Sequence, residues 1–129
     1  MFKVAILQKR SINEQIDKNI ETIIMAMEEA SENHADILLL PECFITGYDL
    51  PMSYEKSIAD NDIRTAKICE NAKKYKIGVV LTAFTKGSKQ PQNSAFVINK
   101  SGNILMKPRR ARCWRPYRRQ GQPFRLRCQ

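Results

Sequence analysis

The residue best placed for chemistry is Glu42, which closely follows a short and almost wholly apolar segment, residues 36–40. Such a segment is typical of a strand that is buried on both faces of a sheet, and Pro41 ends it. In α/β folds, catalytic groups gather at the carboxyl ends of parallel strands. A carboxylate that is desolvated there holds a proton more tightly and can act as a general base. The residue types leave a second interpretation open, in which Glu42 is a solvated loop residue or accepts hydrogen bonds that fix the loop.

Two other reactive side chains have simpler interpretations. Cys43 adjoins Glu42, but neighbours in an extended segment point to opposite sides, so we do not expect Cys43 to be a nucleophile. His34 is the single histidine, and it lies near the end of a predicted helix, where a partly positive imidazole suits the helix dipole. We expect no catalytic role for it.

Cofactor and metal sites are not predicted. The cysteines stand at positions 43, 69, 113 and 128, and no two of them have the CxxC spacing of a zinc or redox site. Cys69 is expected to be a small core residue, and the last two to be incidental thiols. Residues 87–89, Gly-Ser-Lys, lack the rest of a phosphate-binding loop, and no GxGxxG motif exists, so a nucleotide cofactor is not expected.

Predicted strands and helices alternate in the order βαβαβ, and a β-hairpin follows. This order predicts an α/β fold with a largely central sheet. Strands are expected at residues 2–7, 36–40 and 77–84, and the hairpin at residues 93–98 and 104–106 around a loop that contains Gly102.

The helices should cover the sheet with apolar faces. Ser11 and Glu14 have the spacing of a capping box and predict the start of the first helix. Its expected buried face carries apolar residues three or four positions apart, namely Ile16, Ile20, Ile23 or Ile24, Met27 and Ala30. Asp60 or Asp62 can cap the second helix. Its expected face carries Ile63, Ala66, Cys69 and Ala72, with Ile68 and Tyr75 beside them.

The net charge of +9 is concentrated at one end of the chain. Residues 1–107 carry 14 basic and 13 acidic residues, whereas residues 108–129 carry eight arginines, no lysine and no acidic residue. We therefore divide the chain into a domain at residues 1–107 and an Arg-rich tail at residues 108–129. The abrupt change of composition fits a reading-frame slip near residue 107 or 108, and a disordered tail is expected.

Four stretches resemble the nitrilase superfamily of carbon–nitrogen hydrolases: KVAILQ at residues 3–8, KNIET at 18–22, ADILLLPECFITGY at 35–48 and NSAFVINKSGNILMK at 93–107. The resemblance covers residues 1–107 and implies half of an αββα sandwich. It also implies a site with a Glu base, a Lys that stabilises an oxyanion, and a Cys nucleophile further along the chain. Glu42 matches the base.

The remaining parts of the family's site are not matched. Counting from Gly102 puts the family's Lys near position 110, where this chain has Arg110, and the planar guanidinium is a poor substitute for a compact ammonium. Neither Cys113 nor Cys128 lies in a comparable motif. We therefore expect a truncated and inactive form of a hydrolase whose intact relative acts on a small amide, carbamoyl or nitrile substrate, with amides first because that branch is the commoner.

Other classes of function are less favoured. The apolar runs are too short to span a bilayer, and no leader peptide is evident, so we expect a cytoplasmic protein that contacts no membrane. A homo-oligomer is an open expectation. The alternative function is that of a non-catalytic fragment whose Arg-rich tail, with interleaved aromatic residues, binds nucleic acid or other polyanions. A specific nucleic-acid role is not expected, because a slipped frame would yield the same composition.

Overall fold

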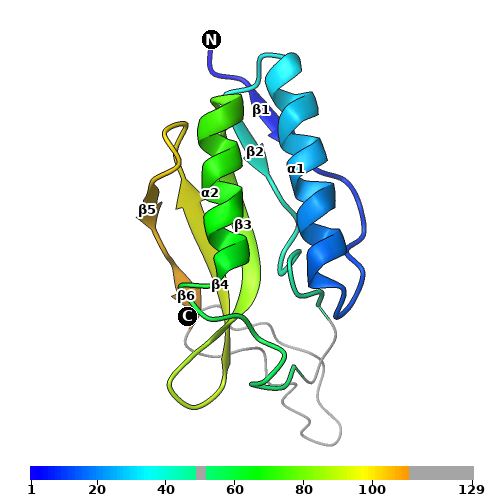
Figure 1. Ribbon diagram of the computed structural model, residues 1–129, viewed down its shortest axis with the longest axis vertical. Helices are drawn as coiled ribbons and strands as arrows, with labels where there is room; N and C mark the ends of the chain where they lie inside the picture. The colour runs from blue at the N-terminus through cyan, green and yellow to red at the C-terminus, as the bar shows by residue number, and fades with distance from the viewer. Residues whose placement is uncertain (49–51, 111–129) are drawn as a thin grey trace, which may run out of the picture.

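The computed structural model describes residues 1–48 and 52–110. Within them the chain forms one mixed sheet in which the strands lie side by side in the order β1-β2-β3-β4-β5, and β6 also pairs with β4 (Figure 1). The strands are β1 (Val4–Ile6), β2 (Ile37–Leu39), β3 (Gly78–Lys86), β4 (Pro91–Ile98), β5 (Ile104–Met106) and β6 (Arg109–Arg110). β1, β2 and β3 are parallel, and β4 runs antiparallel to β3, β5 and β6. The predicted βαβαβ order followed by a hairpin is confirmed.

Two helices, α1 (Ile16–Glu32) and α2 (Ile63–Tyr75), lie side by side over one face of this sheet (Figure 1). They enclose a single apolar core with the strands. Leu38 of β2 belongs to that core, and its register partner Ala5 of β1 packs against it. The neighbours of Ala5 on β1, Val4 and Ile6, are exposed. The result is one helical layer on one sheet, which is half of an αββα sandwich, as the resemblance to the nitrilase superfamily implies.

The first helix begins later than its capping box predicted. The helix starts at Ile16 after Gln15, and no side chain caps it. Glu14 has a positive φ of 61°, and its carboxylate pairs with Lys56. The Asn19 side chain in the first turn of α1 is buried. Its Oδ1 accepts from the Ile12 amide at 2.8 Å, and its Nδ2 donates to the Ile12 carbonyl at 2.7 Å. Lys56 and the Thr46 carbonyl therefore occupy the carboxylate and the amide of Glu14, which a capping box would use, so tertiary contacts set the start of this helix.

The buried face of the second helix also differs from the prediction. Asp62 caps α2 by accepting a hydrogen bond from the Arg64 amide at 2.9 Å, which confirms one of the two expected caps. The buried residues are Thr65, Ile68 and Ala72, while Ile63 at the first turn is 82% exposed and Ala66 is exposed too. The face is thus rotated from the predicted one, because α2 packs against α1 and shares the apolar core with residues of the sheet.

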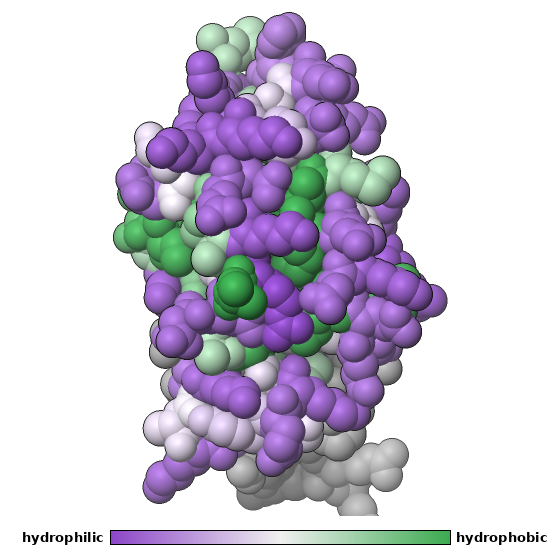
Figure 2. Space-filling model, viewed as in Figure 1, coloured by the Kyte–Doolittle hydropathy of each residue, from purple (hydrophilic) through white to green (hydrophobic). Residues whose placement is uncertain are grey.

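The surface over the helices is mostly hydrophilic, with separate hydrophobic spots (Figure 2). Large exposed apolar side chains include Leu105 and Met106 on β5. In the part of the chain that the structure describes, neither helix has the length and hydropathy that a membrane crossing requires.

Candidate active site

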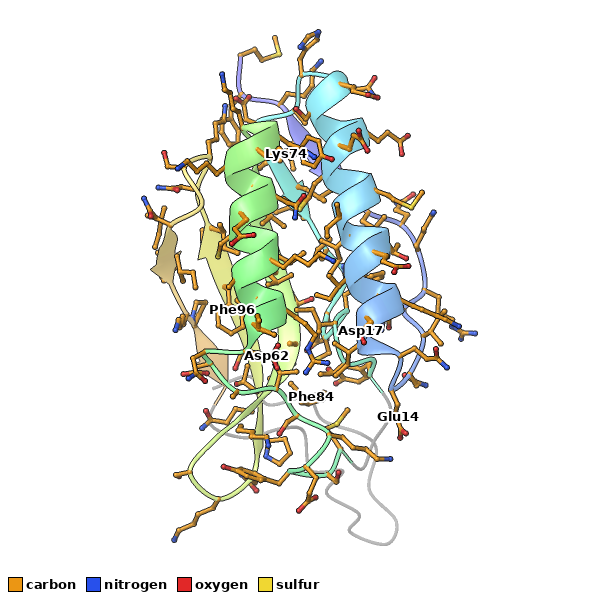
Figure 3. The ribbon with its side chains drawn as sticks, in the orientation of Figure 1. Glu14, Asp17, Asp62, Lys74, Phe84 and Phe96 are labelled. Atoms are coloured by element: carbon orange, nitrogen blue, oxygen red, sulfur yellow. The ribbon has the colours of Figure 1, made fainter. Side chains whose placement is uncertain are left out.

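Glu42 lies at the carboxyl end of β2, where the chain leaves the sheet through a turn at residues 42–46. The first turns of α1 and α2, marked by Asp17 and Asp62, lie toward this same end, and so does Phe84 near the end of β3 (Figure 3). The predicted position at a strand end is therefore confirmed. The sequence also predicted a desolvated Glu42 carboxylate, and this prediction is wrong. Among the described residues the Glu42 side chain is exposed, while residues 43–47 after it are buried.

The turn that carries Glu42 is fastened to β3 and α1 by hydrogen bonds to its backbone. The Thr82 hydroxyl donates to the Pro41 carbonyl and accepts from the Phe44 amide at 3.0 Å. The Ile45 amide donates to the Thr82 carbonyl at 3.1 Å, and the Ile45 carbonyl accepts from Asn19 at 3.0 Å. Each of these contacts comes from a packed element, so they hold the turn in one conformation.

The turn depends on two residues in the left-handed region of backbone space. Gly47 has a φ of 84°, and a Cβ atom there would come within 3.0 Å of the Asn13 Cα atom. Cys43 has a φ of 51°, which costs a non-glycine residue about 1 kcal/mol or more. The segment is therefore a tight turn, and the extended geometry expected at Cys43 is wrong.

Asn93 joins the two residues that begin this turn. Its side-chain Nδ2 donates to Glu42 Oε1, and its Oδ1 accepts from the Cys43 thiol at a Sγ–O distance of 3.4 Å. Asn93 lies near the start of β4 and is the register partner of Phe84 on β3. The two neighbours Glu42 and Cys43 thus reach the same side chain from one turn.

Position 110 lies beside this group. The short strand β6 pairs with β4 so that Arg110 is the register partner of Asn93, and Arg109 is the partner of Ser94. The position at which the resemblance expects the oxyanion-stabilising Lys is therefore one strand away from the side chain that contacts Glu42. The tail residues 111–129, with Cys113 and Cys128, lie outside the described residues.

The other predicted residues lie elsewhere. His34 follows α1 at the start of the segment that leads into β2, is exposed, and has a φ of 59°, so it lies at the opposite end of the strand from Glu42. Cys69 is partly buried on α2 and packs against the core, as predicted. Burial raises the pKa of the Cys69 thiol, which keeps it protonated and unreactive.

Two carboxylates, Asp36 and Asp62, are paired with cationic side chains. At the start of β2, the hydrogen bond from Lys100 lowers the pKa of Asp36, and the Lys3 amide donates to the same carboxylate at 2.7 Å. At the start of α2, the hydrogen bonds from Arg64 lower the pKa of Asp62. In the described ranges, no three His, Cys, Asp or Glu side chains are grouped so that they could hold a metal ion.

Sequence reasoning missed Asn93, Thr82 and Asn19 as parts of the site. A signal for Asn19 existed, since it is a polar residue on the apolar face of a helix, and buried polar residues require partners. Asn93 lies in one of the stretches that carry the resemblance, but its contact with Glu42 joins residues that are 51 positions apart.

The fold and the site define an α/β protein with a carboxylate at a strand end, and the comparisons with known proteins agree. The family model for carbon-nitrogen hydrolases matches residues 3–128. The chain therefore belongs to the carbon-nitrogen hydrolase family. The matched range includes most of the Arg-rich tail, so the boundary that we predict after residue 107 stays a prediction.

The similar proteins are amidases and related hydrolases. The chain is 33% identical over 97 residues to the 2-oxoglutaramate amidase of Bacillus subtilis, covering 73% of this chain and 36% of that protein. It is 33% identical over 107 residues to the hydrolase in the agr operon of Staphylococcus aureus, and the match covers 81% of this chain and 40% of that protein. The structure of an amidase from Nesterenkonia sp. shares the fold, with a TM-score of 0.74 at 23% identity. The match covers 89% of this chain and 44% of that amidase. The chain thus spans less than half the length of these proteins.

Proposed function

We propose that Glu42 is the general base for hydrolysis of a non-peptide C–N bond, with small amides favoured over carbamoyl compounds and nitriles. The observation that carries the proposal is the placement of Glu42 at the carboxyl end of β2, on a turn held by Thr82 and Asn19, next to the strand position 110. Family membership supports the reaction class, and the amidases among the similar proteins support the preference for amides.

The chemistry requires a base at this place. A thiol attacks an amide or nitrile carbon only after it loses its proton, and a carboxylate within reach can take that proton and pass it to the leaving amine. A fixed cation then stabilises the oxyanion of the tetrahedral intermediate. Glu42 suits the first role because its side chain is exposed, while residues 43–47 of the turn that follows it are buried.

We also propose that the 129-residue chain does not turn over substrate. Position 110 holds Arg, whose guanidinium cannot direct a compact charge at one atom as an ammonium does. Of the described cysteines, Cys43 is fully buried and donates to Asn93, and Cys69 lies on α2 away from Glu42. Cys43 lacks the exposure of an activated nucleophile, and the raised pKa of Cys69 disfavours its thiolate.

The test is ammonia release from a panel of small amides, carbamoyl amines and nitriles. The purified chain is compared with Glu42→Gln and with Glu55→Gln, which removes a carboxylate from an exposed loop instead. Activity in the chain that disappears only in Glu42→Gln would support the base and refute the inactivity. If all three are inert, the same variants are made in a gene with the restored reading frame. An active restored enzyme that tolerates Glu42→Gln within about tenfold would refute the base, since general bases contribute about 10²–10⁴.

The remaining expectations stay predictions. A homo-oligomer and a cytoplasmic location rest on the sequence alone. Binding of polyanions by residues 108–129 rests on their charge, and a steep loss of binding with added salt is the expected behaviour of such an interaction.

A further inference from the structure

We propose that Asn93 is a positioning residue that orients the carboxylate of Glu42, and that the Cys43 thiol fixes the orientation of the Asn93 amide. The inference deepens the proposed function, because it concerns the residue that we take as the base. It rests on a juxtaposition of three side chains: Asn93 on β4 lies between two consecutive residues of the turn after β2.

The donors and acceptors define only one orientation of the Asn93 amide. Its Nδ2 faces the Glu42 carboxylate, which can only accept, and its Oδ1 faces the Cys43 thiol, which donates. A flipped amide would put Oδ1 against the carboxylate, and two acceptors would then face each other. The thiol donor and the carboxylate acceptor therefore favour the same amide orientation.

The three residues start from rigid positions. Asn93 has register partners on both sides, Phe84 on β3 and Arg110 on β6, so strands on either side hold its backbone. Cys43 is fully buried and has a left-handed backbone conformation. Its carbonyl accepts a hydrogen bond from the Gly47 amide at 2.9 Å. The Asn93 amide therefore starts from a fixed backbone and has one fixed partner, and it restrains the exposed side chain of Glu42.

The restraint has a consequence for the carboxylate. Within the described residues, the side-chain hydrogen bond of Glu42 is made by Oε1. Holding that oxygen restrains the Glu42 side chain and leaves Oε2 as the oxygen that could exchange a proton with a substrate or a nucleophile.

The experiment follows the side-chain amide of Asn93 by ¹H–¹⁵N NMR in the 129-residue chain, with Asn93→Ala to assign its signals. Solvent exchange of the bonded Nδ2–H is compared in the original chain, Glu42→Ala and the control Glu55→Ala. We expect Glu42→Ala to speed exchange by roughly fivefold, which corresponds to about 1 kcal/mol for one hydrogen bond. The control should leave it unchanged. The Asn99 amide, whose Oδ1 serves the β4–β5 loop, should not respond to either variant.

The role of Cys43 is tested by a conservative pair. Cys43→Ser keeps a donor and should keep the slow exchange of the Asn93 amide, whereas Cys43→Ala removes the donor and should speed exchange toward the Glu42→Ala value. Equal exchange in the original chain and Glu42→Ala would overturn the positioning role of Asn93. Equal exchange in Cys43→Ala and Cys43→Ser would overturn the role of the thiol. Either failure would leave the hydrolase proposal intact, because ammonia release tests that proposal separately.

Discussion

Replacing Thr82 by Val should loosen the turn that carries Glu42 while leaving the packing of β3 unchanged. The two side chains have the same shape, but Val cannot donate to the Pro41 carbonyl or accept from the Phe44 amide. Phe44 is 1% exposed, so water cannot replace the lost acceptor for its amide. Pro41 is only partly buried, and its carbonyl can be rehydrated.

The magnitude follows from these two groups. A buried N–H without an acceptor costs about 1–3 kcal/mol, and a replaceable hydrogen bond costs much less. We expect Thr82→Val to lower the free energy of unfolding by about 2 kcal/mol. The matched control Thr82→Ser keeps both hydrogen bonds and loses one methyl group, so it should cost only about 0.8 kcal/mol.

Urea denaturation followed by far-ultraviolet circular dichroism measures both variants, and the slope with denaturant should stay constant. Hydrogen exchange adds a local measurement: the Phe44 amide should exchange about 30-fold faster in Thr82→Val, the factor that ~2 kcal/mol represents. If Thr82→Ser were as destabilising as Thr82→Val, methyl packing and not the hydroxyl would hold the turn. The hydrogen bonds of Thr82 would then not be the contacts that fasten Glu42 to β3.

Three further predictions concern the turn, the second helix and the gene. Gly47→Ala should lower the free energy of unfolding by more than about 2 kcal/mol in a urea titration, because the new Cβ meets Asn13 and the φ of 84° is unfavourable for alanine. An unchanged free energy of unfolding would contradict the left-handed turn at Gly47. Asp62→Ala should cost about 1 kcal/mol at pH 7. The hydrogen bonds from Arg64 lower the pKa of Asp62, so the difference in free energy of unfolding should be complete above the ordinary carboxyl pKa of 3.8. It should vanish as the pH falls through the lower pKa of the folded state. A difference that stayed constant down to about pH 2 would exclude the carboxylate as its source. Translating the gene in its other frames past residue 107 should recover a Tyr-x-Lys-x-His-like run and a later Cys motif, and their absence would rule out a frame slip.

Several features of the fold could be predicted because they depend on local patterns. The apolar segment before Pro41 predicts β2, the alternation of elements predicts the βαβαβ order, and Asp62 is one of two expected caps. Periodicity is less informative for α2, because a helix that packs on a neighbouring helix and on core residues of the sheet buries a face that no single template describes.

The sequence by itself determined the family, the position of Glu42 at a strand end and the concentration of positive charge after residue 107, since each depends on residue types and their spacing. Only the tertiary structure decided how Glu42 is held. Thr82, Asn19 and Asn93 reach the turn from three different elements, and their separation along the chain carries no periodic signal. Hydrogen bonds between distant polar residues depend on the exact approach of packed elements, and that approach exists only after the core has formed.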